Sequence, residues 1–422
     1  MKDLSISFIT LWRLNDWGKY NRRDEAILWE LSRRNNVSSA LHVEHVSIKG
    51  LIYKFIEWLR EKDKNMKKVY LYHILKGISF KPISVDRNKK YYIYSIVIGY
   101  FGNNKFLKRI SNFFTKIQYG AINRYFVQHN RYTVLIAYPP SQYLPYAIKA
   151  IKHDLLIADF EDDTAERAKN DEEKNKVLQS YKEILPKCKW IFSTSPSITQ
   201  KYRDLAGQEI TFLPNGVDVH NFQANSHKKP FKKNNRIVIG YIGVLNREID
   251  IDLLEYMPDH YPHIDFIMIG SATNECLIEI IKLTKKYSNL HYLGERNYID
   301  IPSYTSYFDI LINIKKNDYT TAGGESQKIY EYLLTGKPIV STPVSPADRF
   351  AGLIYVATDK YQFTESLKKA LEEDNSDLRE KRIKAAIDNS WTKRVNVILE
   401  KVTKLLCVQC NYTQDPNHDL GK

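Results

Sequence analysis

The chain has 422 residues, a formal net charge of +14 and 43% hydrophobic residues, a composition that is ordinary for a globular protein and excludes global disorder. Its length predicts two domains of about 200 residues each. No apolar run reaches the roughly 18 residues that a membrane span needs, and the opening MKDLSISFIT indicates a strand rather than a signal peptide. Four cysteines are too few for a disulfide framework, which favours a reducing cytoplasm.

In chain order, apolar runs alternate with segments of helical spacing, which is typical of a parallel α/β sheet. In the first half we expect strands over 4–9, 39–47, 132–140 and 154–163, a helix over 24–34, and a strand, serine-rich turn and helix over 189–205. In the second half we expect strands over 236–245, 264–271, 289–295, 308–314, 337–342 and 352–357, with helices over 275–287, 378–389 and 389–406.

The turn signal PNGVD (214–218) and the basic, aperiodic stretch after it indicate a linker. We therefore predict an N-terminal domain over 1–208, a linker over 209–235, a C-terminal domain over 236–388, a helix over 389–409 that packs back toward the first domain, and a disordered tail over 410–422. Open parallel sheets bind ligands at the carboxyl ends of their strands, so we expect a cleft there.

The stretch GGESQKIYEYLLTGKPIVST (323–342) predicts a helix that starts near Ser326 and ends at Gly336. Lys328 and Glu331 are three residues apart and share one edge of it. A cation near a helix start and a carboxylate one turn on match a nucleoside diphosphate, with Lys328 toward phosphate and Glu331 toward ribose hydroxyls. An exposed Lys–Glu pair with no ligand is the alternative, and the residues alone leave both open.

Two strings, HYLGERNYIDIPSYTSYFDILINIKKND and GGESQKIYEYLLTGKPIVSTP, resemble the donor domain of GT-B glycosyltransferases. The resemblance is greatest to the group that builds bacterial surface polysaccharides, including teichuronic-acid-type and glucuronosyl transferases, and covers most of residues 190–400. It implies an α/β fold of two Rossmann-like parallel-sheet domains that face a cleft. The N-terminal domain would bind the acceptor and the C-terminal domain the nucleotide-sugar donor.

The resemblance also implies roles for particular residues. Glu331 would bind the ribose, and Lys328 with the backbone of 325–327 would meet the diphosphate or the sugar. GYIGVL resembles the first donor-domain loop. The donor-binding candidates are therefore Glu331, Lys328, Glu325, Ser326, Gln327, Gly243 and Arg247.

This sequence departs from the family pattern at two points. Many GT-B enzymes carry a second acidic residue eight positions before the helix glutamate, where this chain has Gly323 and only Glu325 nearby. The loop after Gly243 lacks the usual Arg…Lys phosphate pair, and Arg247 is its sole basic candidate. The identity of the sugar and part of the diphosphate contact therefore stay open.

The segment ADFEDDTAE (158–166) places several carboxylates just past the end of a predicted strand. Clustered carboxylates repel one another, which can raise a pKa toward values suited to a general base. The segment resembles the Asp–x–x–Asp–Asp motif of the same glycosyltransferase group. We predict Asp162 as the base, with Asp163 and Asp159 as competitors. The alternative is that these residues only cap the following helix.

The segment WGKYNRRDEAILWEL resembles the first loop and helix of the family. It would place Arg22 and Arg23 at the mouth of the cleft, able to meet a diphosphate. A solvated helix start is the alternative interpretation.

Residues 87–153 contain 11 Lys or Arg and no Asp or Glu, whereas the other residues hold 52 basic against 49 acidic ones. The same block has 15 aromatic residues, which predicts a basic, aromatic surface. Within it, residues 104–126 space apolar side chains as a helix does. We expect this helix to lie in an anionic membrane interface through Lys105, Lys108, Arg109, Phe113 and Lys116. A helix that faces the core with a solvated basic side is the alternative.

These patterns predict a glycosyltransferase that moves a sugar from a nucleoside diphosphate donor, UDP above all, to a lipid-linked or polysaccharide acceptor. We expect it at the cytoplasmic face of the cell membrane, without a nucleic-acid partner. None of the motifs requires a metal or another cofactor, and the CVQC at 407–410 is interpreted as two free thiols. A nucleotide-sugar epimerase of the same fold and a non-catalytic membrane- or polyanion-binding homologue are the rival interpretations.

Overall fold

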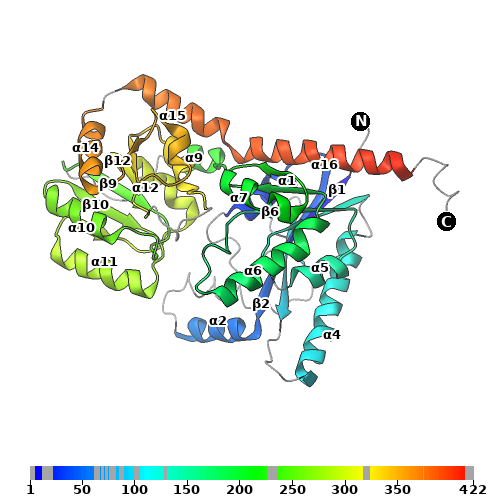
Figure 1. The fold of residues 1–422 in the computed structure, drawn as a ribbon. Coiled ribbons are helices and arrows are strands. Elements are labelled where there is room, and N and C mark those ends of the chain that lie inside the picture. The colour runs from blue at the N-terminus through cyan, green and yellow to red at the C-terminus, as the bar shows by residue number, and fades with distance from the viewer. Residues whose placement is uncertain are drawn as a thin grey trace. The chain divides into compact units, whose positions relative to one another are not determined.

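The computed structural model describes residues 5–11, 22–60, 67, 71, 75, 82–84, 90–98, 105–127, 131–141, 143–225, 230, 235–316, 324–373 and 375–413. Contacts along the chain divide it into two compact units (Figure 1). The first unit comprises Met1–Glu161, Asn170–Phe212 and Val395–Lys422, and the second comprises Asp162–Lys169 and Leu213–Arg394. The short segment Asp162–Lys169 therefore belongs with the second unit although the chain on either side of it belongs with the first.

In the described part of the first unit, eight strands form one sheet in the order β3-β4-β2-β1-β5-β6-β7-β8. Paired strands run parallel except for β3, which is antiparallel to β4. The strands are β1 (Ile6–Leu11), β2 (Val37–Ser47), β3 (Ile83–Ser84), β4 (Tyr91–Ile98), β5 (Tyr132–Ala137), β6 (Leu155–Phe160), β7 (Trp190–Ser193) and β8 (Ile210–Phe212).

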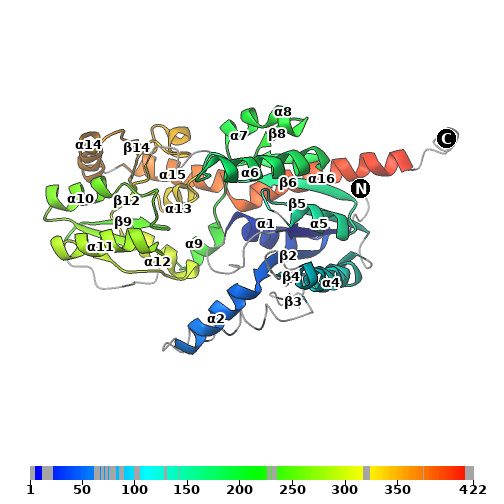
Figure 2. The ribbon, with the colours of Figure 1, turned by 60° about the horizontal axis from the view of Figure 1, so that its bottom comes forward.

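Parallel strands covered on both faces need continuous apolar sequences, and β1 is an example. All six of its residues are buried, and it pairs with β2 on one side and with β5 on the other. Figure 2 shows helices of this unit over the sheet. The helices in the described part of this unit before residue 212 are α1 (Arg23–Ser32), α2 (Ile48–Arg60), α4 (Lys105–Ile122), α5 (Leu144–Ala150), α6 (Asp171–Ile184), α7 (Pro196–Lys201) and α8 (Arg203–Ala206), with a π-helical turn over Asn123–Val127 and a 3₁₀ turn over Leu185–Lys187.

β4 corrects part of the expectation of a basic, aromatic surface over residues 87–153. The side chains of Tyr91, Ile93, Tyr94 and Ile96 are each at most 1% exposed. β4 pairs with β2 along its whole length. Part of the aromatic content that suggested a binding surface is therefore core, because β-branched and aromatic residues are favoured in strands.

The described part of the second unit contains a six-stranded, all-parallel sheet in the order β11-β10-β9-β12-β13-β14. The strands are β9 (Val238–Ile242), β10 (Asp265–Ile269), β11 (Leu290–Tyr292), β12 (Ile310–Asn313), β13 (Ile339–Ser341) and β14 (Tyr355–Val356). Its helices are α9 (Val219–Asn225), α10 (Ile251–His260), α11 (Asn274–Lys286), α12 (Ile301–Tyr307), α13 (Lys328–Leu334), α14 (Lys360–Leu371) and α15 (Ser376–Asp388), with 3₁₀ turns over Tyr298–Asp300 and Ala347–Phe350.

Two separate hydrophobic cores show that this second sheet is wound on both faces. One core packs α10, α11 and α14 against alternate strand residues such as Ile239 and Phe266. The other packs α9, α12, α13 and α15 against residues of opposite parity such as Ile242 and Ile267. Successive side chains of a strand point to opposite faces, so residues of opposite parity fill the two cores. In open parallel sheets of this kind, ligands bind at the loops that follow the carboxyl ends of the strands.

The elements predicted from the sequence are present, with shifts of a few residues at their ends. α13 begins at Lys328 rather than near Ser326. The last helix, α16 (Trp391–Thr413), extends beyond residue 409 into the segment that was expected to be a disordered tail. In the described part of the chain, none of the helices has the length and apolarity needed to cross a membrane.

Candidate donor-binding and catalytic site

Lys328 opens α13 and reaches the loop that follows β9. Its Nζ donates a hydrogen bond of 2.6 Å to Tyr241 Oη and lies 3.9 Å from the centroid of the Tyr241 ring. A Cβ on Gly243 would overlap that same Nζ. Burial lowers the pKa of Lys328 well below its ordinary value, and the charge of Lys315 lowers it further. The charges of Glu248 and Glu331 oppose this lowering of the pKa. The Lys328 side chain is therefore held beside the first loop after the sheet's central strand.

Glu331 lies one turn further along α13 and is 7% exposed. Gln327 Nε2 donates to its Oε1 at 3.4 Å. Burial raises the pKa of Glu331 to about 7, although hydrogen bonds from Tyr298 and Gln327 and the charge of Lys328 act in the opposite direction. A carboxylate held in such a place becomes easier to ionise when a ligand supplies hydroxyl donors to it.

Two glycines allow the loops after β9 and β10 to touch. Gly243 and Gly270 have φ angles of 150° and 147°, a region that favours glycine. A Cβ on Gly270 would overlap the carbonyl oxygen of Gly243. The backbone of Gly243 is thereby fixed against the neighbouring loop and next to Lys328. The sequence prediction that Gly243 and Lys328 belong to one site agrees with this geometry, while their role toward a donor stays a prediction.

The residues just before α13 do not all face the same way. Glu325 has a fully buried side chain, which forms an ion pair with Arg349, accepts from Tyr330 Oη at 2.7 Å and accepts from the backbone N–H of Asn215 at 2.5 Å. Both of its oxygens are therefore engaged within the unit, and only its backbone is left for the predicted donor role. Ser326 Oγ is buried and has no hydrogen-bond partner among the described residues.

The carboxylates of the predicted catalytic segment differ in their surroundings. Asp162 is 28% exposed and its Oδ2 lies 3.2 Å from Arg167 Nη1. A Cβ on Gly324 would overlap the Arg167 guanidinium and come within 3.4 Å of Asp162 Oδ1. Asp163 is 4% exposed and accepts from the backbone N–H of Glu166 at 3.2 Å, within a turn over 164–167. It does not cap the following helix, α6, whose N-cap is Asn170. Asp162 is thus the carboxylate that lies beside the loop before α13.

Asp159 and Arg23 occupy a different place from the predicted one. Arg23 Nε lies 2.7 Å from Asp159 Oδ2, and both side chains are 0% exposed. Arg23 is therefore not a surface residue that could meet a diphosphate, and Asp159 is enclosed with it. Burial raises the pKa of Asp159, and Arg23 opposes that shift. Arg22, the residue before α1, is half-buried.

The remaining basic candidates lie on two elements. Arg247 is exposed after β9, and its Nη2 donates to the Arg167 carbonyl at 3.4 Å. Lys105, Lys108 and Arg109 lie in α4, but their side chains fall outside the described part of the structure. Further along α4, Phe113 and Ile117 are 62% and 47% exposed and Lys116 is exposed, whereas Tyr119 and Ile122 are buried. Of the apolar residues at helical spacing in this segment, Phe113 and Ile117 are therefore exposed, whereas Ala121 is half-buried.

Besides β4 and the burial of Arg23, the sequence did not indicate two further features that bear on function. One is α2, whose Ile52, Phe55, Ile56 and Leu59 are 38–58% exposed at helical spacing. The spacing i, i+3, i+4, i+7 was a signal that could have revealed it. The other is Arg167, whose proximity to Gly324 depends on tertiary contacts between distant parts of the sequence.

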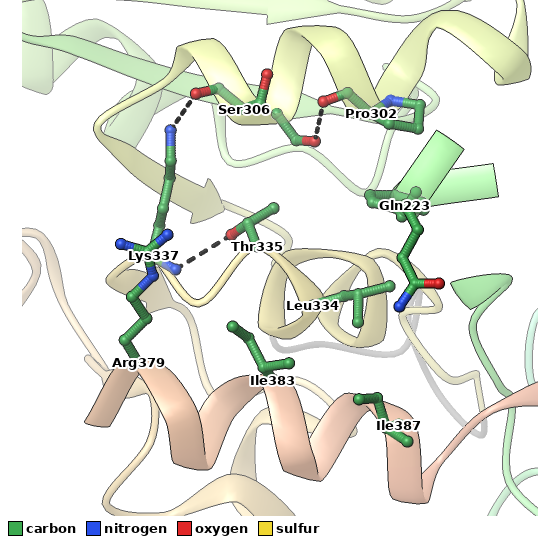
Figure 3. A pocket seen from close by; sticks show the side chains of 11 residues that line it. Gln223, Pro302, Ser306, Leu334, Thr335, Lys337, Arg379, Ile383 and Ile387 are labelled. Atoms are coloured by element: carbon green, nitrogen blue, oxygen red, sulfur yellow. Dashed lines mark hydrogen bonds between the residues drawn. The ribbon is translucent and has the colours of Figure 1, made fainter. Parts of the chain in front are cut away.

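A cavity of about 430 Å³ lies elsewhere in the second unit, among α9, α12, α13 and α15 (Figure 3). Leu334, Ile383 and Ile387 line one part of it, and Lys337 and Arg379 line another. Lys337 Nζ donates to the backbone carbonyls of Ser306 and Phe308 and so closes the end of α12. Neither of the two predicted donor-binding side chains of α13 lines this cavity. No cluster of three or more metal-ligating side chains occurs among the described residues.

No family model matches the chain. Its sequence is 28% identical over 145 residues to TuaH of Bacillus subtilis (strain 168), provisionally named a teichuronic acid biosynthesis glycosyltransferase. That match covers 32% of this chain and 35% of TuaH, so the chain matches about a third of its relative.

Solved structures match over nearly the whole chain. Sucrose-phosphate synthase from Thermosynechococcus elongatus has a TM-score of 0.64 at 10% identity, covering 96% of this chain and 100% of that one. Anabaena HepE in complex with UDP and glucose has a TM-score of 0.58 at 15% identity, covering 95% and 99%. A glycosyltransferase from Rickettsia africae has a TM-score of 0.62 at 13% identity, covering 95% and 99%. The resemblance stated from the sequence is thereby confirmed: the chain has the two-domain α/β fold of the GT-B glycosyltransferases.

Proposed function

We propose that this protein is a glycosyltransferase that moves a sugar from a nucleoside diphosphate donor, UDP-linked, to a lipid-linked or polysaccharide acceptor in surface glycan synthesis. The observation that carries the proposal is the approach of Lys328 to Gly243 at the carboxyl end of the central strand of the second unit, with Glu331 one turn further along α13 and in electrostatic contact with Lys328. HepE, which shares the fold, holds UDP and glucose, and TuaH, which shares sequence, is named for teichuronic acid synthesis.

The proposed donor site uses charge in two places. Lys328 meets the diphosphate, whose negative charge restores the protonated state that burial disfavours. Glu331 accepts hydrogen bonds from the ribose hydroxyls, which favour its ionised form. The backbone at Gly243 is close enough to Lys328 for phosphate oxygens to contact both. These residues bind and orient the donor, and the ammonium stabilises the charge that develops on the departing diphosphate.

An inverting transfer at this site is a single displacement at the anomeric carbon. The acceptor hydroxyl gives its proton to the Asp162 carboxylate, and its oxygen forms a bond to the anomeric carbon of the donor sugar. The bond between that carbon and the diphosphate oxygen breaks, and the nucleoside diphosphate leaves with the electron pair. Asp162 is favoured over Asp163 and Asp159 because it is partly exposed and lies beside Gly324.

A membrane surface is the proposed place of the acceptor, at the cytoplasmic face of the cell membrane. α2 and α4 of the first unit each present exposed apolar side chains at helical spacing. α2 carries Lys49, Lys54 and Arg60 against one acid, Glu57, and α4 lies in the acid-free block. Apolar stripes with flanking cations match an anionic bilayer, in which the apolar face is buried and the cations meet headgroups. α2 extends from the end of β2, away from the sheet (Figure 1 and Figure 2).

The test is a screen of UDP-, GDP- and dTDP-sugars for transfer to extracted lipid-linked glycans. We expect turnover with a UDP-sugar that is lost in Asp162→Asn and in Glu331→Ala. Conversion of the free nucleotide sugar to an isomer without transfer would replace the proposal by an epimerase. The absence of both turnover and UDP binding would indicate a non-catalytic homologue. Full transfer by Asp162→Asn would remove that residue from the role of base.

A further inference from the structure

The segment Asp162–Lys169 brings a cation to the donor site that neither the family pattern nor the sequence spacing indicates. Arg167 is 22% exposed, and its guanidinium lies against Gly324 in the loop before α13. Its backbone carbonyl accepts from Arg247, the basic candidate after β9. The Arg167 side chain is thus held at the proposed donor loop before α13, and the loop after Gly243 has Arg247 as its sole basic residue.

Arg167 and Lys328 both interact electrostatically with Glu248. The pKa of Glu248 is lowered by Lys315, which lies 2.7 Å from it, and also by Arg167 and Lys328, against the effect of burial. All of these residues belong to the second unit. Arg167 lies near these charged residues and is not wholly buried. Its guanidinium has the planar fork of N–H donors that binds phosphate oxygens in pairs.

One partner of the Arg167 guanidinium is Asp162, the proposed base. Arg167 Nη1 lies 3.2 Å from Asp162 Oδ2, so one carboxylate oxygen is occupied by the guanidinium. A diphosphate carries more negative charge than one carboxylate, and it offers the guanidinium two or more oxygens. Donor and Asp162 therefore compete for Arg167.

We infer that Arg167 is a diphosphate-binding residue that couples donor binding to release of Asp162. This inference rests on the proposed function. When the donor binds, Arg167 turns from the carboxylate to the phosphate, and Asp162 becomes able to accept the proton of the acceptor hydroxyl. As the bond between the anomeric carbon and the diphosphate oxygen breaks, Arg167 stabilises the charge on the leaving group. Asp162 is thus paired with Arg167 until the donor binds. This pairing limits the activation of water by Asp162 when no donor is bound.

The test is a double-mutant cycle on UDP affinity, measured by calorimetry on the full chain. We expect Arg167→Gln to weaken UDP binding by about tenfold or more, as loss of a charged hydrogen bond does. Asp162→Asn should tighten UDP binding by about two- to fivefold, because it removes the competitor, a partly exposed ion pair of modest strength. In the Arg167→Gln background, Asp162→Asn should have no effect on UDP affinity.

Arg203→Gln is the matched control, since Arg203 is 60% exposed and forms an ion pair with Glu209 in the first unit. It should bind UDP as the unaltered protein does. Arg167→Lys keeps the charge and tests the fork geometry, and it should bind UDP more tightly than Arg167→Gln. Unchanged or weaker UDP binding by Asp162→Asn, or additive effects in the cycle, would overturn the inference.

The same data separate this inference from the proposed function. If Lys328→Met and Glu331→Ala lose UDP affinity while Arg167→Gln does not, the donor site stands and the role of Arg167 fails. If the unaltered protein does not bind UDP at all, both the proposed UDP-linked donor and the role of Arg167 in binding it are wrong. Melting temperatures of all variants show whether a loss of affinity reflects unfolding.

Discussion

Glu331 is held in a place that opposes its charge, as expected of a residue kept for a ligand. Burial raises its pKa to about 7, above the ordinary 4.5. Between about pH 4.5 and pH 7, Glu331 is protonated to a greater extent in the folded protein than in the unfolded chain. The free energy of unfolding therefore falls as pH rises from about 4.5 to about 7.

We expect Glu331→Gln to remove that slope, because the amide keeps the shape and does not ionise. The pKa shift corresponds to roughly 2–4 kcal/mol between pH 4.5 and 7.5. Urea unfolding at several pH values measures it, and Glu365→Gln, on α14, is the control that should leave the slope unchanged. Equal slopes in Glu331→Gln and the unaltered protein would show that Glu331 ionises normally.

A second prediction concerns the buried pair of Arg23 and Asp159. Removing one partner leaves an uncompensated charge in the core, which typically costs about 3–5 kcal/mol. We expect Arg23→Met to lower the free energy of unfolding by that order, whereas Arg33→Met should change it by less than about 1 kcal/mol because Arg33 is 48% exposed. Denaturant midpoints measure the difference. A small effect of Arg23→Met would mean that the pair is not enclosed in solution.

A third prediction concerns the ends of β9 and β10. A side chain on Gly243 would overlap Lys328, and one on Gly270 would overlap the Gly243 backbone. We expect Gly243→Ala to lower UDP affinity and to destabilise the protein by about 1–3 kcal/mol, from steric overlap and from a φ of 150°. Gly207→Ala in the first unit, where φ is 65° and the space is open, should keep UDP affinity. Normal affinity in Gly243→Ala would place the phosphates away from that loop.

At the scale of elements, α2 exposes Ile52 and Phe55 and α4 exposes Phe113, and the sequences of both helices contain lysine and arginine. Our proposal is that these two helices anchor the protein to a membrane surface. We expect the protein to sediment with vesicles that contain phosphatidylglycerol. Ile52→Ser with Phe55→Ser should weaken binding by about tenfold or more, since each side chain contributes about 1–2 kcal/mol on burial. Salt should weaken it as well.

The matched control for that experiment lies on α11 of the second unit, where Ile278 and Ile281 are 56% and 41% exposed. Ile278→Ser with Ile281→Ser should leave vesicle binding unchanged. Equal sedimentation with neutral phosphatidylcholine vesicles would indicate apolar adsorption without the cations. Failure to bind either kind of vesicle would contradict the proposal that α2 binds a membrane surface.

At the scale of the whole molecule, the sequence indicates both sheets because parallel strands must be apolar along their length, as β1 and β9 are. β4 is missed because its tyrosines and flanking lysines match a basic surface equally well at the level of composition. Arg23 is missed as a core residue because its carboxylate partner lies 136 positions along the chain. A pattern read over a few residues contains no information about such a partner.

The candidate site was predictable to a similar extent. Lys328 and Glu331 share a helix edge, and that relation is local and could be inferred. The approach of Arg167 to Gly324 depends on which unit the segment Asp162–Lys169 joins, and that is decided by tertiary packing. The orientation of Glu325 toward Arg349 is likewise a property of the folded unit.

The central claim is that one turn of α13 binds the donor nucleotide through Lys328 and Glu331, and calorimetric titration with UDP tests it most directly. We expect Lys328→Met and Glu331→Ala each to lower UDP affinity by about 10- to 100-fold, the value of a charged hydrogen bond. Lys282→Met, which alters an exposed cation on α11, should bind UDP normally. Unchanged UDP affinity in both Lys328→Met and Glu331→Ala would contradict the account.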